Sequence, residues 1–416
     1  MKELYYSEFH SRGGEKMNDL IAFFEQVKTI EPQLVPCPDY DPFPEDSRIK
    51  AIRFSTLPFD GRSTSAFAYV GFPDCAAPEK PVPGMVLVHG GAGHAYAEWV
   101  QDWVERGFAA ISFDGFCQTY TGAPQTYDAS LDHWAPDPEA YPPMTCFIAG
   151  DVPFEEQGFT YYLADILLAH NLLRADKRVN KELIGLTGIS WGGYAGTLAA
   201  CLDDRFAFAA PVYGSGFQNV SKTNWGRVFR DDGVADRWDA GQLLGEMTMP
   251  IRFFNGDGDP FFDADSTTAS AASAPNGSLT LLPGFTHGQI EGSTIPELFR
   301  FAEEQIGQGD RNIRIDQLAA EGNGAVVSFT LPEDVEQAQV YLYYKTEDLI
   351  YEDKELKEPW RFETHEAPDG RAFVPIPAEA AVFYFCVEGK TNEGQTLHAA
   401  TGVFRRETWD DAETTD

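Results

Sequence analysis

Short apolar segments alternate with segments of helical period through the middle of this chain. The apolar segments are of strand length and run without alternation: GMVLV, FAAISF, ELIGLTGI, FAFAAPV and PIRFF. This texture is typical of strands that are buried on both faces. Apolar residues recur at helical spacing in EWVQDWVERG, TYYLADILLAHNLLRA and TIPELFRFAEEQI. Strands that alternate with helices form a mostly parallel sheet covered on both faces, so residues 48–308 are predicted to form an α/β domain.

The remaining parts of the chain depart from this alternation. Residues 1–47 are predicted to form an N-terminal helix followed by an extended arm rich in Pro and Asp. Residues 115–157 lack a clear period and are predicted to be a lid-like insert, a pocket wall or a structural loop. Residues 311–406 hold strand-length segments separated by turn residues, which predicts a small β-sandwich of the immunoglobulin or fibronectin kind. The acidic tail, residues 407–416, is expected to be frayed.

Composition and charge indicate which partners and which compartment to expect. The chain has 416 residues and a net charge of −34, whereas nucleic acids and anionic membranes bind basic surfaces, so neither is expected as a partner. No apolar run approaches a membrane span, and the N-terminus lacks the pattern of a secretory signal. The six cysteines are scattered without a C-x-x-C pair, which favours reduced thiols over a disulfide framework or a zinc site. We therefore expect a cytoplasmic protein.

The segment GISWG, residues 188–192, has the G-x-S-x-G pattern of a nucleophile elbow around Ser190. The predicted strand ELIGLTGI precedes it, and GGYAGTLAACL supplies a helix of small residues after it. An elbow needs this strand, turn and helix, because the tight turn holds the serine hydroxyl clear of the sheet. Gly188 and Gly192 stand where larger side chains would collide with the turn. The motif alone leaves a chance serine between glycines as the alternative.

An acid and a histidine follow in the chain order that such a triad takes. His287 lies in FTHG, directly after the predicted strand SLTLLPG. Two aspartates after the strand PIRFFNG, Asp257 and Asp259, compete for the acid. Asp259 is favoured because it lies further into the loop and just before Pro260, whereas Asp257 is expected to face solvent or cap the turn. His287 would then accept the proton of Ser190, and Asp259 would hold the imidazole tautomer.

A glycine-rich segment, VHGGAG at residues 88–93, follows the first buried strand of the alternating region. Its turn would present backbone N–H groups to the reacting carbonyl. We expect the oxyanion donors to be the N–H groups of Gly91 and Trp191. His89 is expected chiefly to orient this loop. Nucleophile, base and oxyanion donors are all protein groups, so neither a metal nor an organic cofactor is implied.

Four segments together resemble the α/β-hydrolase superfamily, and within it the acetyl xylan esterase and dienelactone hydrolase-like branch, near the catalytic domain of prolyl oligopeptidase. They are HGGAGHAYAEWVQDWVERGFAAISFD, DKRVNKELIGLTGISWGGYAGTLAACLDDRFAFAAPVYGSGF, MPIRFFNGDGDPFF and LLPGFTHG. The resemblance covers residues 50–306 and implies the same triad. It also implies that Tyr213 and Trp191 lie near the acyl pocket, and His89 is a further candidate there.

The chain departs from that branch in ways that narrow its activity. GFCQTY stands where cephalosporin C deacetylases carry an Arg-Gly-Gln signature, and Ser190 stands where dienelactone hydrolases use cysteine. The resemblance therefore favours a serine esterase that removes small acyl groups, such as acetyl groups, from sugars or xylo-oligosaccharides. The alternatives are a serine peptidase of prolyl oligopeptidase type and a non-catalytic carbohydrate-binding protein with Trp360, Tyr343 and Tyr344 as platforms. The acyl group, the alcohol and a homo-oligomeric state stay open.

Overall fold

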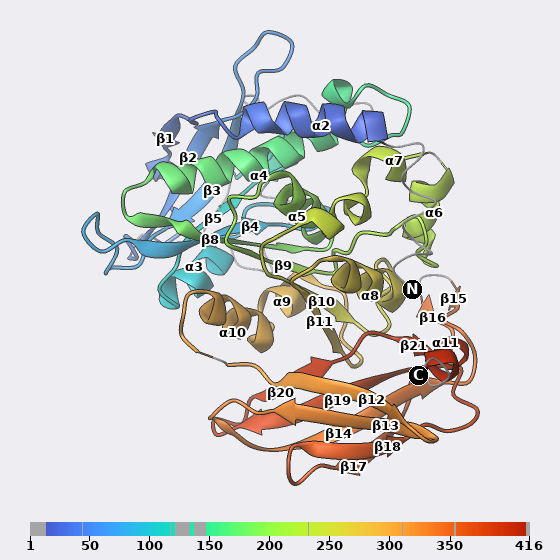
Figure 1. Ribbon diagram of the computed structural model, residues 1–416. Coiled ribbons are helices and arrows are strands. Elements are labelled where there is room, and N and C mark those ends of the chain that lie inside the picture. Colours follow the sequence, from blue (N-terminus) through green and yellow to red (C-terminus); the bar gives the residue numbers. More distant parts are fainter. Residues whose placement is uncertain are drawn as a thin grey trace.

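The computed structural model stacks a large helix-covered sheet on a smaller body of antiparallel sheets (Figure 1). It describes residues 14–43, 45–116, 118–120, 134–136, 147–231, 233–309, 311–352 and 355–412. Only the ends of the predicted insert at 115–157 and a small hairpin within it, β6 (Gln118–Tyr120) and β7 (Trp134–Pro136), fall within these ranges. The prediction of a lid therefore lies largely outside the described residues.

A nine-stranded sheet forms the centre of the larger body, in the order β1-β2-β3-β5-β4-β8-β9-β10-β11 among the described residues. Its strands are β1 (Leu34–Pro36), β2 (Ile49–Ser55), β3 (Ser65–Gly71), β4 (Val82–Val88), β5 (Ala109–Phe113), β8 (Val179–Ile189), β9 (Phe208–Val212), β10 (Ile251–Gly256) and β11 (Gly277–Leu282). Neighbouring strands are antiparallel from β1 to β5 and parallel from β5 to β11. The parallel strands are the apolar segments without alternation, because helices cover both of their faces.

Helices cover the sheet in two layers (Figure 1). They are α2 (Gly14–Val27), α3 (Ala97–Glu105), α4 (Gly158–Ala175), α5 (Trp191–Leu202), α6 (Asn224–Asp231), α7 (Ala235–Trp238), α8 (Ala264–Ser273), α9 (Gln289–Ser293) and α10 (Pro296–Gln305). One layer holds α4 and α5 with α2 outside them, and the other holds α3 and α10, whose Trp103 and Phe299 rings are in contact. Helix α4 is apolar nearly all round because it lies between the sheet and α2.

Two larger antiparallel sheets and a small two-stranded one are described in the C-terminal body. One larger sheet contains β12 (Arg314–Glu321), β13 (Gly324–Thr330) and β18 (Arg371–Pro375). The other contains β17 (Arg361–Glu366), β14 (Val335–Lys345), β19 (Val382–Thr391) and β20 (Thr396–Ala400), with β21 (Phe404–Arg405) against β19. Both sheets contribute to one apolar core, including Val327, Leu342 and Phe385, which is compatible with the predicted sandwich. Its likeness to immunoglobulin or fibronectin domains stays a prediction.

The C-terminal tail is more ordered than its composition predicts. Helix α11 (Arg406–Ala412) covers most of it. The ring of Trp409 lies 5.4 Å from that of Phe383 and 5.0 Å from that of Phe404, between ring centroids. The prediction of a frayed tail is therefore wrong for residues 407–412, because the half-buried Trp409 packs against these rings.

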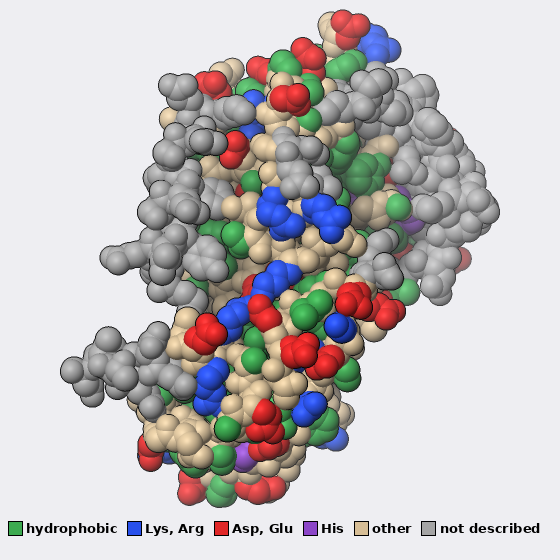
Figure 2. Space-filling view, turned by 90° about the vertical axis from the view of Figure 1, so that its right-hand side faces the viewer, with side chains coloured by type: hydrophobic (Ala, Val, Ile, Leu, Met, Phe, Trp, Pro, Cys, Tyr) green, Lys and Arg blue, Asp and Glu red, His purple; other side chains and the backbone are tan. Residues whose placement is uncertain are grey.

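A separate apolar core lies between the helix-covered sheet and the C-terminal body and joins them. Its buried residues come from both: Ala264, Leu281, Leu349, Val382, Tyr384, Cys386 and Val403. Ion pairs surround it, such as that between Arg405 and Asp265, and Figure 2 shows basic and acidic side chains side by side where the two bodies meet. Of the described cysteines, Cys75, Cys201 and Cys386 form no disulfide bond. Within the described ranges, none of the helices is both long and apolar enough to span a membrane.

Candidate active site

Ser190 occupies a strained turn between β8 and α5. Its backbone has φ 55° and ψ −116°, a conformation that residues other than glycine rarely adopt and that costs about 1–3 kcal/mol. The Ser190 N–H donates to Val212 O of the neighbouring strand β9 at 2.9 Å, and Ser190 O accepts the first helical bond from Tyr194 N–H. Strand and helix thus hold the serine in place from both sides of the turn.

Close backbone packing explains the two glycines of the motif. A Cβ atom on Gly188 would lie 2.2 Å from Gly192 O, inside the same turn. A Cβ atom on Gly192 would lie 2.2 Å from Val88 O and 2.3 Å from His89 O, at the end of β4. Each distance is far below a normal contact, so only glycine fits either position while α5 begins this close to β4.

The side chains of Ser190, His287 and Asp259 form a hydrogen-bonded chain. His287 Nε2 lies 2.7 Å from Ser190 Oγ, and His287 Nδ1 lies 2.6 Å from Asp259 Oδ2. The other carboxylate oxygen, Asp259 Oδ1, accepts the N–H groups of Phe261 at 2.9 Å and Phe262 at 2.8 Å. With Asp259 ionised, Nδ1 donates to it and Nε2 is free to accept the serine proton.

Of these three hydrogen-bonded side chains, the Asp259 carboxylate is buried and the His287 imidazole is partly exposed. The Asp259 side chain is 0% exposed, whereas the His287 side chain is 16% exposed and can reach a substrate. The backbone bonds to Asp259 follow from its place before Pro260, since an aspartate in such a turn accepts N–H groups two and three residues on. Phe261 and Phe262 were missed by the sequence reasoning, although the segment DGDPFF carries that turn signal.

Asp257, the competing aspartate, takes part in different contacts. It is 4% exposed, and its Oδ1 accepts the N–H of Gly284 at 2.9 Å while its Oδ2 accepts the hydroxyl of Tyr384 at 2.9 Å. Burial raises the pKa of Asp257, and these hydrogen bonds oppose the rise. The expectation that Asp257 faces solvent is wrong because the C-terminal body covers it. Its carboxylate binds the N–H of Gly284, in the loop that follows β11 and not in its own turn.

Two aromatic rings hold the imidazole of His287. The centroid of the Tyr213 ring lies 4.4 Å from that of His287, and the centroid of Phe261 lies 4.8 Å from it. The Tyr213 hydroxyl donates to Thr286 O at 2.6 Å, and burial together with the charge of Asp259 raises the pKa of Tyr213. Tyr213 is fully buried beside the imidazole. Its predicted place near the acyl pocket stays a prediction.

The glycine-rich turn after β4 lies against the elbow. A Cβ atom on Gly91 would lie 3.9 Å from the Cβ of Trp191, and one on Gly90 would lie 3.4 Å from the Cβ of Ser190. Gly93 N–H donates to Gly90 O at 3.0 Å and closes the turn. Trp191 is the first residue of α5, where N–H groups have no acceptor within the helix. The two predicted oxyanion donors are therefore neighbours beside the nucleophile.

His89 ties this turn to the end of β5. Its Nε2 accepts the N–H of Gly115 at 3.0 Å, so Nδ1 carries the proton and donates to Gly90 O at 2.8 Å. Tyr162 donates its hydroxyl to His89 O at 2.8 Å. Burial lowers the pKa of His89 to about 3, which keeps the ring neutral. His89 is fully buried, and both of its ring nitrogens take part in these backbone contacts. Its predicted place at the substrate pocket stays a prediction.

An aromatic cluster lies beside the nucleophile. The Trp191 ring is in contact with Phe147 at 5.5 Å, Phe159 at 5.0 Å and Trp225 at 5.4 Å between centroids. Trp225, on α6, is half-buried. The sequence reasoning missed Phe147 and Trp225, because no local pattern links either position to the elbow.

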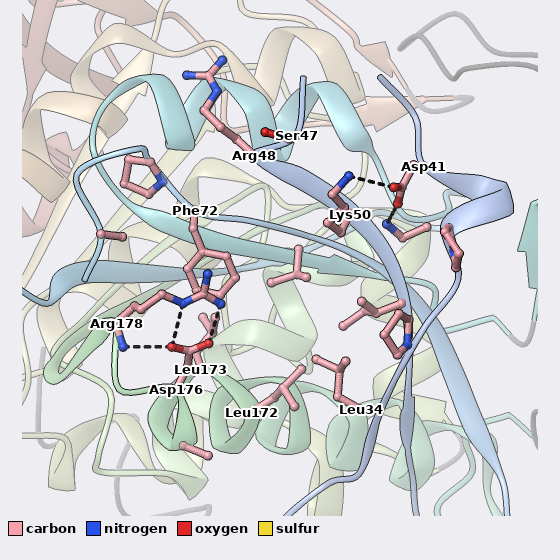
Figure 3. A pocket seen from close by; sticks show the side chains of 18 of the residues that line it. Leu34, Asp41, Ser47, Arg48, Lys50, Phe72, Leu172, Leu173, Asp176 and Arg178 are labelled. Atoms are coloured by element: carbon pink, nitrogen blue, oxygen red, sulfur yellow. Dashed lines mark hydrogen bonds and ion pairs between the residues drawn. The ribbon is translucent and has the colours of Figure 1, made fainter. Parts of the chain in front are cut away.

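A cavity of about 620 Å³ lies elsewhere, between the β2 and β3 strands and the end of α4 (Figure 3). Two ion pairs line it, with Arg178 bound to Asp176 and stacked on Phe72, and Lys50 bound to Asp41. The side chains of Ser190, His287 and Asp259 do not line this cavity. The candidate site is therefore placed at Ser190 and not at this cavity.

No family model and no curated protein matches this chain. Its fold is similar to that of a solved acetyl xylan esterase from Paenibacillus sp. R4, with a TM-score of 0.51 and 18% identity over 69% of this chain and 94% of that one. It is also similar to acetyl xylan esterase 1 from Thermoanaerobacterium sp. JW/SL YS485, with a TM-score of 0.51 and 13% identity over 71% of this chain and 94% of that one. The chain thus has the α/β-hydrolase fold, as predicted.

Proposed function

We propose that the protein is a serine hydrolase that cleaves carboxylic esters. The observation that carries this proposal is the chain from Ser190 Oγ to His287 Nε2 and from His287 Nδ1 to Asp259 Oδ2, at 2.7 and 2.6 Å, with the serine on a strained elbow. A buried acid, an accessible imidazole and a hydroxyl in this order are what an acyl-transfer nucleophile requires.

The reaction follows from these groups. Ser190 Oγ attacks the ester carbonyl while His287 Nε2 takes its proton, and Asp259 stabilises the imidazolium. The oxyanion is bound by the N–H groups of Trp191 and Gly91, each worth about 3–4 kcal/mol in the transition state. His287 then returns the proton to the departing alcohol. Water attacks the acyl-serine with the same base and releases the acid.

We further propose that the substrate is a small acyl ester, such as an acetylated sugar or xylo-oligosaccharide. Two proteins of similar fold are named acetyl xylan esterases, which supports an acetyl ester as the first substrate to test. The aromatic cluster of Trp191, Trp225 and Phe147 supports a short acyl group, since these bulky rings occupy the space beside the nucleophile.

The test is hydrolysis of p-nitrophenyl acetate by the purified protein. We expect release of acetate, loss of this activity in Ser190→Ala, and a single adduct on Ser190 after treatment with an alkyl phosphonate. Ser270→Ala is the matched control, because Ser270 donates only along its own helix, to Ser266 O at 2.8 Å. Activity retained in Ser190→Ala would contradict the proposal.

The alternatives differ in their predicted substrates. A peptidase would cleave aminoacyl p-nitroanilides faster than acetyl esters, so the ratio of the two rates separates it from an esterase. A carbohydrate-binding role would use exposed aromatic platforms. Tyr344 is buried, however, Tyr343 stacks on Tyr384 at 4.9 Å, and Trp360 donates to Asp257 O. These contacts favour a packing role for all three candidate platforms.

A further inference from the structure

Asp257 connects the loop of the acid with the loop of the histidine. It stands two residues before Asp259 at the end of β10, and its N–H donates to Leu282 O, the last residue of β11, at 3.2 Å. Its Oδ1 accepts the N–H of Gly284, three residues before His287. One side chain therefore bridges the two segments that carry the acid and the base.

The C-terminal body holds Asp257 from the other side. Tyr384, on β19, donates its hydroxyl to Asp257 Oδ2 at 2.9 Å, and Trp360 donates its indole N–H to Asp257 O at 3.1 Å. The two rings meet edge to face at 5.0 Å, and Tyr343 stacks on Tyr384 with an interplanar angle of 8°. Packing of these rings leaves the two donors little freedom to move away from Asp257.

A second contact joins the same loop to the C-terminal body. The hairpin of β15 (Tyr351–Glu352) and β16 (Glu355–Leu356) lies over it. A Cβ atom on Gly258, between the two aspartates, would lie 3.9 Å from the Cβ and Cδ2 of Leu356. Burial raises the pKa of Tyr351, and the nearby carboxylates of Asp263 and Asp259 add to the rise. The hairpin thus limits the space into which the loop could relax.

The contacts of Asp257 make its orientation depend on Tyr384. A buried carboxylate needs donors to both oxygens, and here one comes from the histidine loop and the other from the C-terminal body. Without the Tyr384 hydroxyl, Oδ2 would be left buried without this donor, and the carboxylate would turn toward another donor or toward water. Either movement weakens the bond to Gly284 and loosens the two loops relative to each other.

We propose that Asp257 is a positioning residue for the Asp259–His287 pair, and that the C-terminal body, through Tyr384 and Trp360, is a required part of the active site. The catalytic half of this inference rests on the proposed function. Because misplacement of a catalytic group by a fraction of an ångström slows turnover without weakening ground-state binding, the effect should fall on kcat and leave KM nearly unchanged.

The test compares Tyr384→Phe with Tyr341→Phe in the full chain. Both changes remove one hydroxyl from the same sheet, but Tyr341 donates to Gln339 Oε1 and does not contact Asp257. We expect Tyr384→Phe to lower kcat for p-nitrophenyl acetate on the order of tenfold, per site titrated with phosphonate, with KM within about twofold. Tyr341→Phe should match the wild-type protein in both. Equal kcat in all three proteins would overturn the inference.

A double-mutant cycle tests whether the two residues act through one bond. Asp257→Asn keeps an acceptor for Gly284 but places an amide N–H₂ group, which cannot accept a hydrogen bond, opposite the Tyr384 hydroxyl. We expect the double variant Asp257→Asn/Tyr384→Phe to be no slower than Asp257→Asn alone, since both changes weaken the same contact. Multiplied losses in the double variant would instead mean that Tyr384 acts by another route, and would overturn the inference.

Hydrogen exchange gives a readout that needs no ester substrate. Amides of residues 256–263 and 284–288 should exchange faster in Tyr384→Phe than in Tyr341→Phe, because both loops lose their common anchor. Unchanged exchange would overturn the positioning role even if the esterase is active. Absence of esterase activity in the wild-type protein, with faster exchange in the variant, would instead contradict the proposed function and leave the positioning role supported.

Discussion

The turn at Ser190 and the loop at Asp259 reach their geometry by different means. The serine turn is held by its own glycines and by strands β4 and β9, whose backbones approach it closely. The acid loop is anchored at Asp257 by Tyr384, 127 residues further along the chain, and by Trp360, 103 residues along. The nucleophile turn is thus held by backbone packing within the central sheet, while the loops of the acid and the base also depend on contacts from the C-terminal body.

The largest effect is expected from Asp259→Asn, which tests the acid directly. An asparagine can offer its N–H₂ group to Nδ1 and hold the imidazole in the wrong tautomer. We expect kcat to fall about 10⁴-fold, with little change in the unfolding midpoint. Asp257→Asn should lower kcat far less, because the Asp257 side chain acts on His287 only through Gly284. Steady-state kinetics of both variants measure the contrast, and equal losses would contradict the assignment of Asp259 as the acid.

Gly192→Ala breaks the serine turn itself. The new Cβ would lie 2.2 Å from Val88 O, so β4 and α5 must separate. We expect the free energy of unfolding to fall by about 3 kcal/mol and esterase activity to be lost. The matched control is Gly196→Ala in the same helix, where the Cβ meets Leu186 at an ordinary 3.4 Å. That change should stabilise the protein by about 0.5–1 kcal/mol in urea unfolding.

His89 gives the turn after β4 a dependence on pH. Its pKa is about 3 in the folded protein, lowered by burial from 6.5, so the unfolded chain binds a proton that the folded protein excludes. The stability due to neutral His89 is complete above pH 6.5 and is lost as the pH falls toward 3, by about 1.4 kcal/mol per pH unit. Between about pH 6 and pH 5, the free energy of unfolding of His89→Gln should therefore fall less than that of the wild-type protein by about this amount.

The pH profile of His89→Gln has to be compared with that of the wild-type protein, because other buried groups also make the free energy of unfolding depend on pH. His94, with a pKa lowered to about 4 by burial, adds a loss of the same sign. Glu98, with a pKa raised to about 7 by burial, has the opposite effect, since its stabilisation is lost as the pH rises. Only the difference between the variant and the wild-type protein isolates His89. Parallel stability profiles for the two would contradict a neutral, buried His89.

The smallest effect is expected at the edge of the contact between the two bodies. Arg405 binds Asp265 with both terminal nitrogens, at 2.8 and 2.7 Å, but its side chain is 33% exposed. Arg405→Lys should lower the free energy of unfolding by about 1 kcal/mol or less and leave kcat unchanged. A loss of kcat as large as that of Tyr384→Phe would show that any loosening of the contact disturbs the site, and would weaken the special role of Asp257.

Much of the fold could be predicted because its strands and helices carry strong patterns. Helix α8 was missed, since ADSTTASAAS has no apolar period. Its start is set by Asp263, whose side chain accepts the N–H of Ser266 at 2.8 Å, and it packs on β10 and β11. The order of the tail was also missed, because Trp409 packs on Phe383 and Phe385 of β19, which no local pattern links to it.

The sequence by itself determined the serine turn and the chain order of its partners. Gly188 is required by the backbone of its own turn, whereas Gly192 is required by Val88 O and His89 O at the end of the neighbouring strand β4. Only the tertiary structure decided what Asp257 does. Two aspartates separated by one glycine look alike in sequence, and their roles differ because one faces His287 while the other is covered by Tyr384. Contacts over such distances depend on how two bodies pack, which no local pattern encodes.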